Sequence, residues 1–583
     1  MNILGISCWY HDSAAALVQD GRVVGAASEE RFTRKKHDEE FPQNAVEYVL
    51  RTGGVSVKDL DAVIFYDKPF VKFERLLTTY LGSFPWSLPS FAKAMPVWIA
   101  KKLWIKSLIR KELDYNGELL FMEHHQSHAA SAFLTSPFEK AAILCADGVG
   151  EWATTTFGEG EGNRFRIIRE VRFPHSLGLL YSAFTYYLGF KVNSAEYKVM
   201  GLAPYGEPKY VDLIMDNLLD LRDDGSFQMN MDYFSYHKGL RMTNGKFDRL
   251  FGRPPRQREE DPLEQFHKDM AMSVQKVTEE AILRMARHLH RETGKEDLCM
   301  AGGVALNCVA NGRLLREGPF RRIYVQPAAG DAGGALGAAL FGWYTLLNKP
   351  RTPETFYPYT GPEYSDEEIQ KHFDEKQAPY RKLSRDELVR ETARLLDEEQ
   401  AVIGWMQGKM EFGPRALGNR SILADPRRPD NRDRVNLKVK FRESFRPFAP
   451  IVLEEKAEEW FDLRGHKSPY MLHVCQVHPQ KRTIPAVTHV DGSARIQTVS
   501  REMNPLVYDV LAEFDRRTGC PLLINTSYNV RSEPIVNSPE DAYRCFMATN
   551  IDYLVVGPYL LDKREQPEKN RVGKDWLETF ELD

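Results

Sequence analysis

The first thirty residues alternate short apolar runs with polar turns, the pattern of strands joined by tight connections. The predicted strands are residues 3–7, 14–19 and 22–28, with Asp20-Gly21 as a hairpin turn. About 140 residues later the rhythm returns, with predicted strands at 142–146, 152–157 and 165–170 and turns at Asp147-Gly148 and "GEGEGN". The repeat indicates two related lobes, each a small sheet with helices. Two unrelated meandering hairpins are the alternative.

Longer periodic stretches complete this half of the chain. Residues 261–292 predict a helix that opens with Asp-Pro, and "DLCMAGGVALNCVANGRLL" predicts a strand, a Gly302-Gly303 turn and a helix. Another strand ("RRIYVQP") and a helix after Asp331 follow. Residues 90–113 are basic and amphipathic, which favours a helix with a solvated polar face on one side and a packed apolar stripe on the other. A membrane-surface helix is the alternative reading of that segment.

The second half reads as a separate α/β unit. Residues 350–366 are rich in Pro, Thr, Tyr and Glu and predict a linker after a first domain at 1–349. Beyond it we expect a helix at 384–399 and strands at 401–405, 521–525 and 552–556, within a second domain at 367–563. Residues 564–583 are polar and predict a peripheral tail.

Composition narrows the class of protein. The chain has 583 residues, 43% hydrophobic and 27% charged, which is too long for one core and excludes a disordered or collagen-like chain. Its net charge of −4 gives no general attraction for nucleic acid. Seven cysteines without C-x-x-C spacing argue against a disulfide framework and fit a reducing compartment.

Targeting and membrane signals are also missing from the pattern. The opening "MNILGISCWYHDSAAALV" lacks a basic leader region and reads as a buried strand. The longest near-apolar run, residues 332–347, has 16 residues, fewer than the roughly 20 that a membrane span needs. We therefore expect a soluble, cytoplasmic protein that contacts neither membrane nor nucleic acid, with an oligomeric state that the sequence does not fix.

Two histidines and two aspartates form a candidate metal set. His124 and His128 in "EHHQSHAASAF" are spaced i, i+4, so on a helix their imidazoles share one face. Asp147 ends a buried-looking strand, and Asp331 opens a small-residue helix. Such a set, without thiolate, suits iron, manganese or zinc. The alternatives are a satisfied helical histidine and, for Asp331, an ordinary N-cap.

Two further segments point to anions. Gly302-Gly303 would let backbone amides approach a phosphate at a helix N-terminus, or is merely a tight turn, and no Walker A motif is present. Residues 409–446 carry 11 basic and five acidic side chains, a charge of +6 against −10 for the rest. A solvated basic face is the usual explanation, and RNA is another, but arginines held in Gly/Pro turns favour phosphate.

These segments, with several others, resemble the NodU/CmcH family of O-carbamoyltransferases. The resemblance runs in order from about residue 1 to about 560. The motifs that carry it are "GISCWYHDSAAALV", "SEERFTRKKHD", "HHQSHAASAF", "EYKVMGLAPYG", "GGVALN", "GDAGGALGAAL", "FGPRALGNRSILADPR", "FRESFRPFAP" and "LLINTSYNV".

The resemblance implies a fold and a set of site residues. The first domain would be similar to the threonylcarbamoyl transferase of tRNA modification, a duplicated actin/sugar-kinase-like pair of lobes, and the second similar to YrdC. His11 would be the catalytic residue, and the metal, with iron the implied ion, would be held by His124, His128, Asp147 and Asp331. Gly302, Gly303 and Asn307 would bind nucleotide in the first domain. The residues for ATP, with Mg²⁺, and carbamoyl phosphate in the second would be Arg415, Lys440, Arg446, Met471, Arg495, Asn525 and Ser527.

The implied reaction has two steps. Carbamoyl phosphate and ATP would form carbamoyl-AMP, and the carbamoyl group would pass to a hydroxyl of a small molecule such as a sugar or natural product. A neutral His11 with a pKa near ~6.5 would take the hydroxyl proton as general base. A tRNA threonylcarbamoyl transferase and a small-molecule kinase of the same superfamily remain the alternatives.

Overall fold

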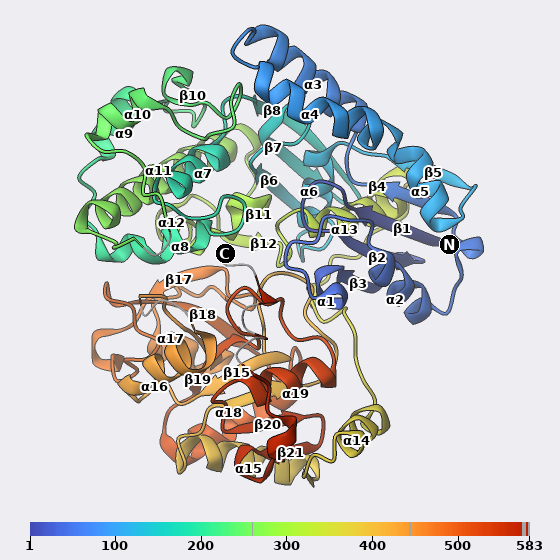
Figure 1. Cartoon of the computed structure of the whole chain (residues 1–583), viewed down its shortest axis with the longest axis vertical. Coiled ribbons are helices and arrows are strands. Elements are labelled where there is room, and N and C mark those ends of the chain that lie inside the picture. Colours follow the sequence, from blue (N-terminus) through green and yellow to red (C-terminus); the bar gives the residue numbers. More distant parts are fainter. Residues whose placement is uncertain (259–260, 442–444, 574–575, 577–578, 581–583) are drawn as a thin grey trace. The chain divides into compact units, whose positions relative to one another are not determined.

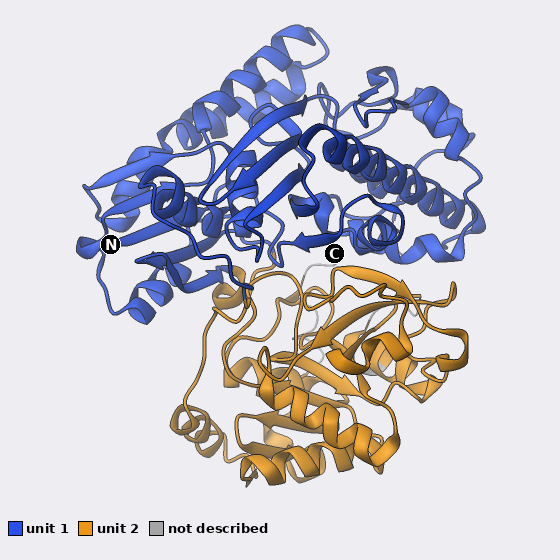
Figure 2. Ribbon diagram, turned by 180° about the vertical axis from the view of Figure 1, so that it is seen from behind, with its two compact units in different colours: residues 1–29, 37–356 blue, residues 30–36, 357–583 orange. Residues whose placement is uncertain are grey.

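The computed structural model describes the chain except residues 259–260, 442–444, 574–575, 577–578 and 581–583, and it leaves the side chain of Lys438 undescribed. It divides into two compact units (Figure 2). Unit 1 comprises Met1–Glu29 and His37–Phe356, and unit 2 comprises Glu30–Lys36 and Tyr357–Asp583. The expected linker at 350–366 spans the division near residue 356. No helix within the described ranges is both long and apolar enough to cross a membrane.

The first sheet of unit 1 has the order β3-β2-β1-β4-β5. Its strands are β1 (Asn2–Ser7), β2 (Ala14–Gln19), β3 (Arg22–Ser28), β4 (Ala62–Phe65) and β5 (Glu118–Phe121). Strands β1, β2 and β3 form an antiparallel meander, and β4 and β5 extend it in parallel. The three predicted N-terminal strands and their hairpin turn are therefore confirmed.

The second sheet of unit 1 repeats this topology. Its strands are β6 (Lys140–Ala146), β7 (Ala153–Glu161), β8 (Arg164–Arg172), β11 (Asp297–Ala301) and β12 (Arg322–Val325). Read from β8, the order β8-β7-β6-β11-β12 matches that of the first sheet, with the same antiparallel meander and parallel extension. The predicted duplication is confirmed.

One predicted turn is shorter than expected. Most of "GEGEGN" belongs to strand β7, which continues through Glu161, and the chain reverses at Gly162 with a φ of 62°. Gly158 and Gly160 are strand residues: a Cβ on Gly158 would lie 2.6 Å from the Arg166 carbonyl oxygen on β8, and one on Gly160 would lie 2.6 Å from the Phe133 ring of α6. Close packing explains these two glycines, and turn geometry explains Gly162.

Two short helices between the sheets approach each other closely. They are α6 (His124–Phe133) and α13 (Ala332–Phe341), and α13 also packs on β1 and β2. A Cβ on Gly337 would lie 2.0 Å from the Ser127 carbonyl oxygen, and one on Gly5 would lie 1.9 Å from that of Ala335. Glycine is needed at both positions because the backbones nearly touch. This contact brings the start of α6 close to the start of α13.

The remaining elements of unit 1 surround these sheets (Figure 1). The predicted helix at 261–292 is α11 (Gln265–Thr293), whose N-cap Glu264 forms a capping box with His267. The others are α2 (Gln43–Gly53), α3 (Pro69–Gly82), α4 (Leu88–Ala100), α5 (Ile105–Leu113), α7 (Leu177–Tyr187), α8 (Glu196–Leu202), α9 (Val211–Asn217), β9 (Leu219–Leu221), β10 (Phe227–Met229), α10 (Gly245–Phe251) and α12 (Cys308–Glu317).

Unit 2 is built on a nine-stranded sheet in the order β13-β21-β20-β14-β15-β19-β16-β18-β17. Its strands are β13 (Arg381–Lys382), β14 (Ile403–Met406), β15 (Arg420–Ala424), β16 (Ala449–Leu453), β17 (His473–Gln476), β18 (Ser493–Val499), β19 (Leu522–Ser527), β20 (Tyr553–Val556) and β21 (Tyr559–Asp562). Its helices are α1 (Glu30–Thr33), α14 (Asp366–Glu375), α15 (Arg385–Asp397), α16 (Pro429–Asp433), α17 (Ala457–Trp460), α18 (Pro505–Thr518) and α19 (Pro539–Ala548). The strands and helix expected here are all present.

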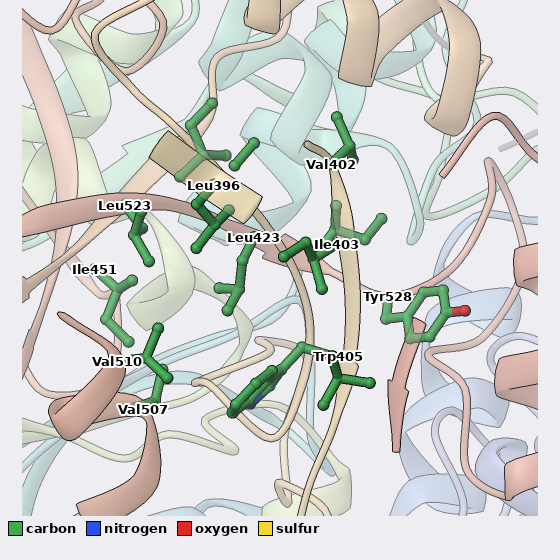
Figure 3. Close-up of a cluster of buried hydrophobic side chains, with 14 of the residues drawn as sticks. Leu396, Val402, Ile403, Trp405, Leu423, Ile451, Val507, Val510, Leu523 and Tyr528 are labelled. Carbon is green, nitrogen blue, oxygen red and sulfur yellow. The ribbon is translucent and has the colours of Figure 1, made fainter. Parts of the chain in front are cut away.

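The sheet of unit 2 carries a large apolar core (Figure 3). Trp405, Leu423, Ile451 and Tyr528 are all fully buried in it. Val572, Trp576 and Phe580 also pack against this core, so that part of the expected tail is attached to unit 2.

Residues 30–36 leave unit 1 and pack into unit 2. Arg31 donates a hydrogen bond of 2.9 Å to the Gly413 carbonyl. Arg34 donates to the Ile535 carbonyl at 2.7 Å and forms a 2.9 Å ion pair with the fully buried carboxylate of Glu533. The first domain was expected to be one continuous segment, residues 1–349. The sequence did not indicate that residues 30–36 belong to unit 2, because this depends on contacts with residues about 500 positions away.

Candidate functional site

The four predicted metal-binding residues converge in unit 1. His124 and His128 lie one turn apart on α6, Asp147 follows β6, and Asp331 precedes α13. The two Nε2 atoms are 3.1 Å apart, and each is 3.1 Å from Asp147 Oδ2. Asp331 Oδ1 lies 3.7 and 3.8 Å from the same nitrogens. One ligand atom from each residue falls within 4.8 Å of the others, so this four-residue cluster could hold a metal ion.

The electrostatics of the four-residue cluster favour a bound cation. Both histidine side chains are buried, and the two aspartates are largely so. Burial lowers the pKa of His124, but the charges of Asp331 and Asp147 raise it well above its usual value. Burial raises the pKa of Asp147, but its contacts with both histidines hold it well below the ordinary range. Two imidazole nitrogens and two carboxylates are a donor set that suits a divalent transition metal.

Two carboxylates that the sequence reasoning missed support His124. Glu151 accepts hydrogen bonds from the backbone N–H groups of His124 at 3.1 Å and Lys68 at 2.8 Å, and so caps the start of α6. Asp67 Oδ2 lies 3.6 Å from His124 Nδ1 and forms a buried ion pair with Lys72. A carboxylate behind a ligand histidine fixes the ring and its tautomer. The available signal was the acidic residue that ends the apolar run "AVIFYD".

The glycine turn lies beside the four-residue cluster. Gly302 has a φ of 89°, and a Cβ there would meet the Ala146 carbonyl oxygen at 2.2 Å. The Gly303 N–H donates to Asp147 Oδ1 at 3.2 Å. Asn307 caps α12 through the N–H of Ala310 and exchanges hydrogen bonds with Gln275. Of the three expected nucleotide-binding residues, the two glycines therefore touch or adjoin a cluster ligand, while the Asn307 side chain is engaged in capping.

His11 belongs to a second cluster in unit 1, formed with Asp12 and His37. His11 Nδ1 lies 3.1 Å from one carboxylate oxygen of Asp12, and His37 Nδ1 lies 2.8 Å from the other. The second nitrogen of each ring also has a partner: His11 Nε2 is 3.0 Å from the Asn193 carbonyl, and His37 Nε2 is 3.3 Å from Ser194 Oγ. These three residues, the His11 cluster, could also hold a metal by proximity alone.

The protonation expected for His11 is wrong. Burial lowers the pKa of His11, but the neighbouring charge of Asp12 outweighs this effect and raises the pKa to about 10. This shift favours the protonated imidazole at neutral pH, and such a ring can accept a proton only after it has lost one. An isolated imidazole has a pKa near ~6.5, and the carboxylate of the next residue, Asp12, raises it here.

In unit 2 the structure joins Lys440 to Ser527. The Lys440 ammonium donates to the carbonyl and the hydroxyl of Ser527 at 2.5 and 3.1 Å, and to the Asn529 carbonyl at 3.0 Å. Asn525, two residues earlier on β19, donates to Gln497 Oε1 at 2.7 Å and to the Ala416 carbonyl at 3.2 Å. Three of the expected anion-binding residues, Lys440, Asn525 and Ser527, therefore lie at or near the end of β19.

The other expected residues of unit 2 lie on neighbouring segments. Arg495 stands two residues before Gln497 on β18, so the two side chains share a face of the sheet. Arg415 adjoins the Ala416 carbonyl to which Asn525 donates. The Arg446 carbonyl accepts a hydrogen bond from the side chain of Asn436, which lies in the short helix 434–440 that ends at Lys440. Met471 is buried, has a left-handed backbone conformation, and lies two residues before the start of β17. Arg442 and Glu443 of the basic window lie outside the described residues.

One arginine of the basic window has a structural role. Arg420 is fully buried, and its guanidinium donates to the carbonyls of Gln407, Gly408 and Pro362 at 2.7, 3.0 and 3.0 Å. Glu411 supports the same loop by accepting backbone hydrogen bonds, among them 2.7 Å from Leu417. The argument that an arginine in a Gly/Pro turn needs an anion is therefore wrong for Arg420, because backbone carbonyls satisfy it.

Comparison with known proteins identifies the family. Residues 2–340 match the family described as carbamoyltransferase N-terminus, and residues 393–563 match carbamoyltransferase C-terminus. The chain is 54% identical to the Synechocystis sp. protein sll1178 over the whole of both chains. It is 40% identical to nodulation protein NolNO of Sinorhizobium fredii, covering 95% of this chain and 79% of that one. It is 31% identical to nodulation protein U of Rhizobium tropici, covering 98% of each.

Similarity to solved structures is weaker. T. kodakarensis HypF is 15% identical with a TM-score of 0.31, covering 60% of this chain and 48% of that one. Component A of (R)-2-hydroxyglutaryl-CoA dehydratase from Acidaminococcus fermentans is 14% identical with a TM-score of 0.31, covering 58% and 97%. The sequence relationships, which span both units, establish that this chain is a member of the carbamoyltransferase family.

Proposed function

We propose that the chain is an ATP-dependent O-carbamoyltransferase. Unit 2 would form carbamoyl-AMP from ATP and carbamoyl phosphate, and unit 1 would transfer the carbamoyl group to a hydroxyl of a small molecule. The observation that carries the proposal is the convergence of His124, His128, Asp147 and Asp331 in a chain of this family. The repeated sheet supports a pair of actin/sugar-kinase-like lobes in unit 1, and we propose a YrdC-like role for unit 2.

The basic residues of unit 2 would serve the first step. Both substrates are anionic, so Arg415, Arg446 and Arg495 would offset their mutual repulsion. Water would cleave carbamoyl phosphate to carbamate and phosphate, and a carbamate oxygen would then attack the α-phosphorus of ATP, which releases pyrophosphate. Lys440, held by Ser527 and Asn529, would present a fixed positive charge at the end of β19. ATP would enter with Mg²⁺, which carries part of the phosphate charge.

The four-residue cluster would serve the second step. His124, His128, Asp147 and Asp331 would hold a divalent transition metal, for which we propose Fe²⁺. A bound metal of this kind supplies Lewis-acid polarisation of a carbonyl or phosphoryl oxygen. The Gly303 N–H, which donates to Asp147, would orient that carboxylate. His11 in its deprotonated form would accept the proton of the acceptor hydroxyl, while Asp12 fixes the orientation of its ring.

The acceptor we propose is a small hydroxyl compound rather than a tRNA. The net charge of −4 gives no general basic surface for a nucleic acid, and the excess of positive charge is confined to residues 409–446. We expect the protein to act in the cytoplasm, where ATP and carbamoyl phosphate are available.

Pyrophosphate release tests the first step. We expect release only when ATP and carbamoyl phosphate are both present. Lys440→Ala should abolish it, since an unpaired phosphate charge in a partly desolvated site costs about 2–5 kcal/mol. Lys481→Ala, outside the proposed pocket, is the matched control. Supplying preformed carbamoyl-AMP to Lys440→Ala should restore transfer.

Three results would contradict the proposal. ADP as the product would indicate a small-molecule kinase. Pyrophosphate release that requires threonine and bicarbonate, with transfer to tRNA, would indicate a threonylcarbamoyl transferase. Failure of carbamoyl-AMP to restore transfer in Lys440→Ala would show that the two steps are not divided between the units.

A further inference from the structure

Exposed apolar side chains are concentrated on one segment of unit 1. Among the described residues, 16 large hydrophobic side chains are exposed, and nine of them lie between residues 70 and 104. We call these nine the apolar patch: Phe70, Leu81, Phe84, Trp86, Leu88, Phe91, Val97, Ile99 and Trp104. Single exposed apolar residues are common in soluble proteins, but such a concentration marks an interaction surface.

The helices that carry the apolar patch are firmly packed on their other side. Figure 1 shows α3 and α4 at the outer edge of unit 1. On α4, Met95 and Trp98 are buried, and the Trp98 ring lies 5.6 Å from that of Phe73 on α3. The exposure of the patch is therefore not the result of loose packing, since the same helices have a well-buried inner face.

Helix α3 has the reverse of the usual amphipathic arrangement. Its buried residues include Lys72 and Arg75, while Phe70 and Leu81 are 70% and 74% exposed. The buried charges have partners: Lys72 pairs with Asp67, and Arg75 donates to the Gly150 carbonyl at 2.8 Å. A surface helix normally turns its apolar side inward. Here the inner face supports the four-residue cluster through Asp67, and the apolar side faces outward.

The charge around the apolar patch is mainly positive, with Glu74 on α3 as an exposed acidic residue. Residues 81–111 contain six basic side chains and no acidic one, in a chain whose net charge is −4. Lys93, Lys106, Arg110 and Lys111 are exposed. Trp86 and Trp104 are 75% and 59% exposed, and tryptophan is the side chain that favours the boundary between water and lipid. Exposed aromatic and aliphatic groups beside lysines and arginines are typical of elements that lie in an anionic lipid surface.

We propose that the apolar patch docks on the surface of an anionic phospholipid bilayer, lying in the interface without crossing it. Phe84, Trp86 and Leu88 would enter the headgroup region, and the exposed lysines and arginines would contact the lipid phosphates. The proposal departs from the expectation of no membrane contact, because the sequence pattern did not reveal which side of these helices is buried. It uses no step of the proposed reaction.

A second copy of the chain is a less favourable occupant. A symmetric dimer through the apolar patch would place the same basic groups opposite one another, and like charges across an interface cost several kcal/mol. An anionic lipid surface supplies the opposite charge as well as an apolar layer. Charge complementarity therefore selects the bilayer.

Co-sedimentation with vesicles tests the proposal on the full-length protein. We expect it to bind vesicles of phosphatidylcholine that contain phosphatidylglycerol, and to bind phosphatidylcholine alone much less. Leu81→Ser together with Trp86→Ser should weaken binding at least tenfold, since each removes an apolar side chain from the interface. Lys93→Gln should weaken it about fivefold, and added salt should weaken it further. Leu240→Ser, a 66% exposed leucine outside the patch, is the matched control and should bind normally.

The outcomes are separable from failures of folding or of catalysis. Because the substituted side chains are exposed, all variants should keep the far-ultraviolet dichroism and melting temperature of the parent, and the double variant should still release pyrophosphate. Absence of binding to anionic vesicles, or unchanged binding by the double variant, would overturn the proposal. A parent dimer that the double variant converts to monomer would assign the apolar patch to self-association instead.

Discussion

Unit 1 contains two clusters of metal-type residues that differ in how their nitrogen atoms are oriented. In the four-residue cluster, the Nε2 atoms of His124 and His128 are 3.1 Å from each other and from the same oxygen of Asp147. In the His11 cluster, Asp12 separates the two imidazoles by giving one oxygen to each. Both clusters have two histidines and at least one aspartate, but only the first directs its ligand atoms at one point.

The difference separates a cation site from a hydrogen-bond network. Two neutral imidazole nitrogens cannot both point lone pairs at each other without a proton or metal between them. The four-residue cluster therefore needs a proton or a metal ion at this point, and its four converging ligand atoms would suit a metal. The His11 cluster is satisfied by its own partners, Asn193 and Ser194 included, and suits proton transfer better than metal binding. Composition and proximity do not distinguish these cases, whereas the direction of each nitrogen does.

The largest expected effect comes from removing a ligand of the four-residue cluster. His128→Ala should lose the bound metal and abolish carbamoyl transfer, since one of only two imidazole donors is gone. Pyrophosphate release by unit 2 should continue. Elemental analysis of the purified variant measures the metal, and full metal with full transfer would contradict the ligand assignment.

Substituting a histidine of the His11 cluster should lower the rate of carbamoyl transfer without changing metal binding. His11→Asn should keep metal content and pyrophosphate release and lower transfer by about 10²-fold, the usual contribution of a general base. Transfer measured with preformed carbamoyl-AMP gives this number directly. If the variant lost metal instead, the proposed division of roles between the clusters would be wrong.

Removing the Asp67 carboxylate, which lies behind His124, should have an intermediate effect on metal affinity. Asp67→Asn should weaken metal affinity by about 10–100-fold, because the carboxylate behind His124 no longer orients its ring. The substitution also leaves Lys72 buried without a counter-charge, so Asp67→Asn with Lys72→Met serves as the control for electrostatic destabilisation. Metal titration by competition with a chelator measures the affinity. Unchanged affinity in both variants would make Asp67 a purely structural residue.

The pH profile of transfer tests the role of His11 without a ligand substitution. The pKa of His11 is raised to about 10, so at neutral pH only a small fraction of the imidazole is deprotonated. If His11 is the base, the parent's transfer rate should rise by about tenfold per pH unit above neutrality and level off near pH 10. His11→Asn should lack this rise. A parent rate that is flat across this range would return the base role to water or another group.

The sequence predicted local features of the fold well and distant contacts poorly. Strands β1, β2 and β3, and the shared face of His124 and His128, follow from alternation and i, i+4 spacing within a few residues. The meeting of His124 with Asp331 depends on the close approach of α6 and α13, which requires glycine at Gly337. That contact has no local signature: residue type and position made the four residues a candidate set, and the family resemblance implied that they are the ligands of one metal.

Charged groups were the other source of error. The general expectation that arginines in the basic window meet anions does not hold for Arg420, because the pattern does not show the backbone carbonyls that surround its guanidinium. The predicted pKa of His11 was wrong for the same reason, since the pKa depends on how the Asp12 carboxylate is oriented toward the ring. The exposed side of α3 was likewise invisible, because a helix that buries Lys72 reverses the rule by which its faces are assigned.

The passage of residues 30–36 into unit 2 determines how the gene can be divided. A polypeptide that began at Tyr357 would lack α1 and would leave the buried carboxylate of Glu533 without Arg34, a loss on the order of 3–5 kcal/mol for a broken buried pair. A protease that cut only near residue 356 would not release unit 2, since its α1 would still be joined to unit 1 through residues 29–30 and 36–37. Splitting or circularly permuting this protein therefore requires that Glu30–Lys36 stay with the second half.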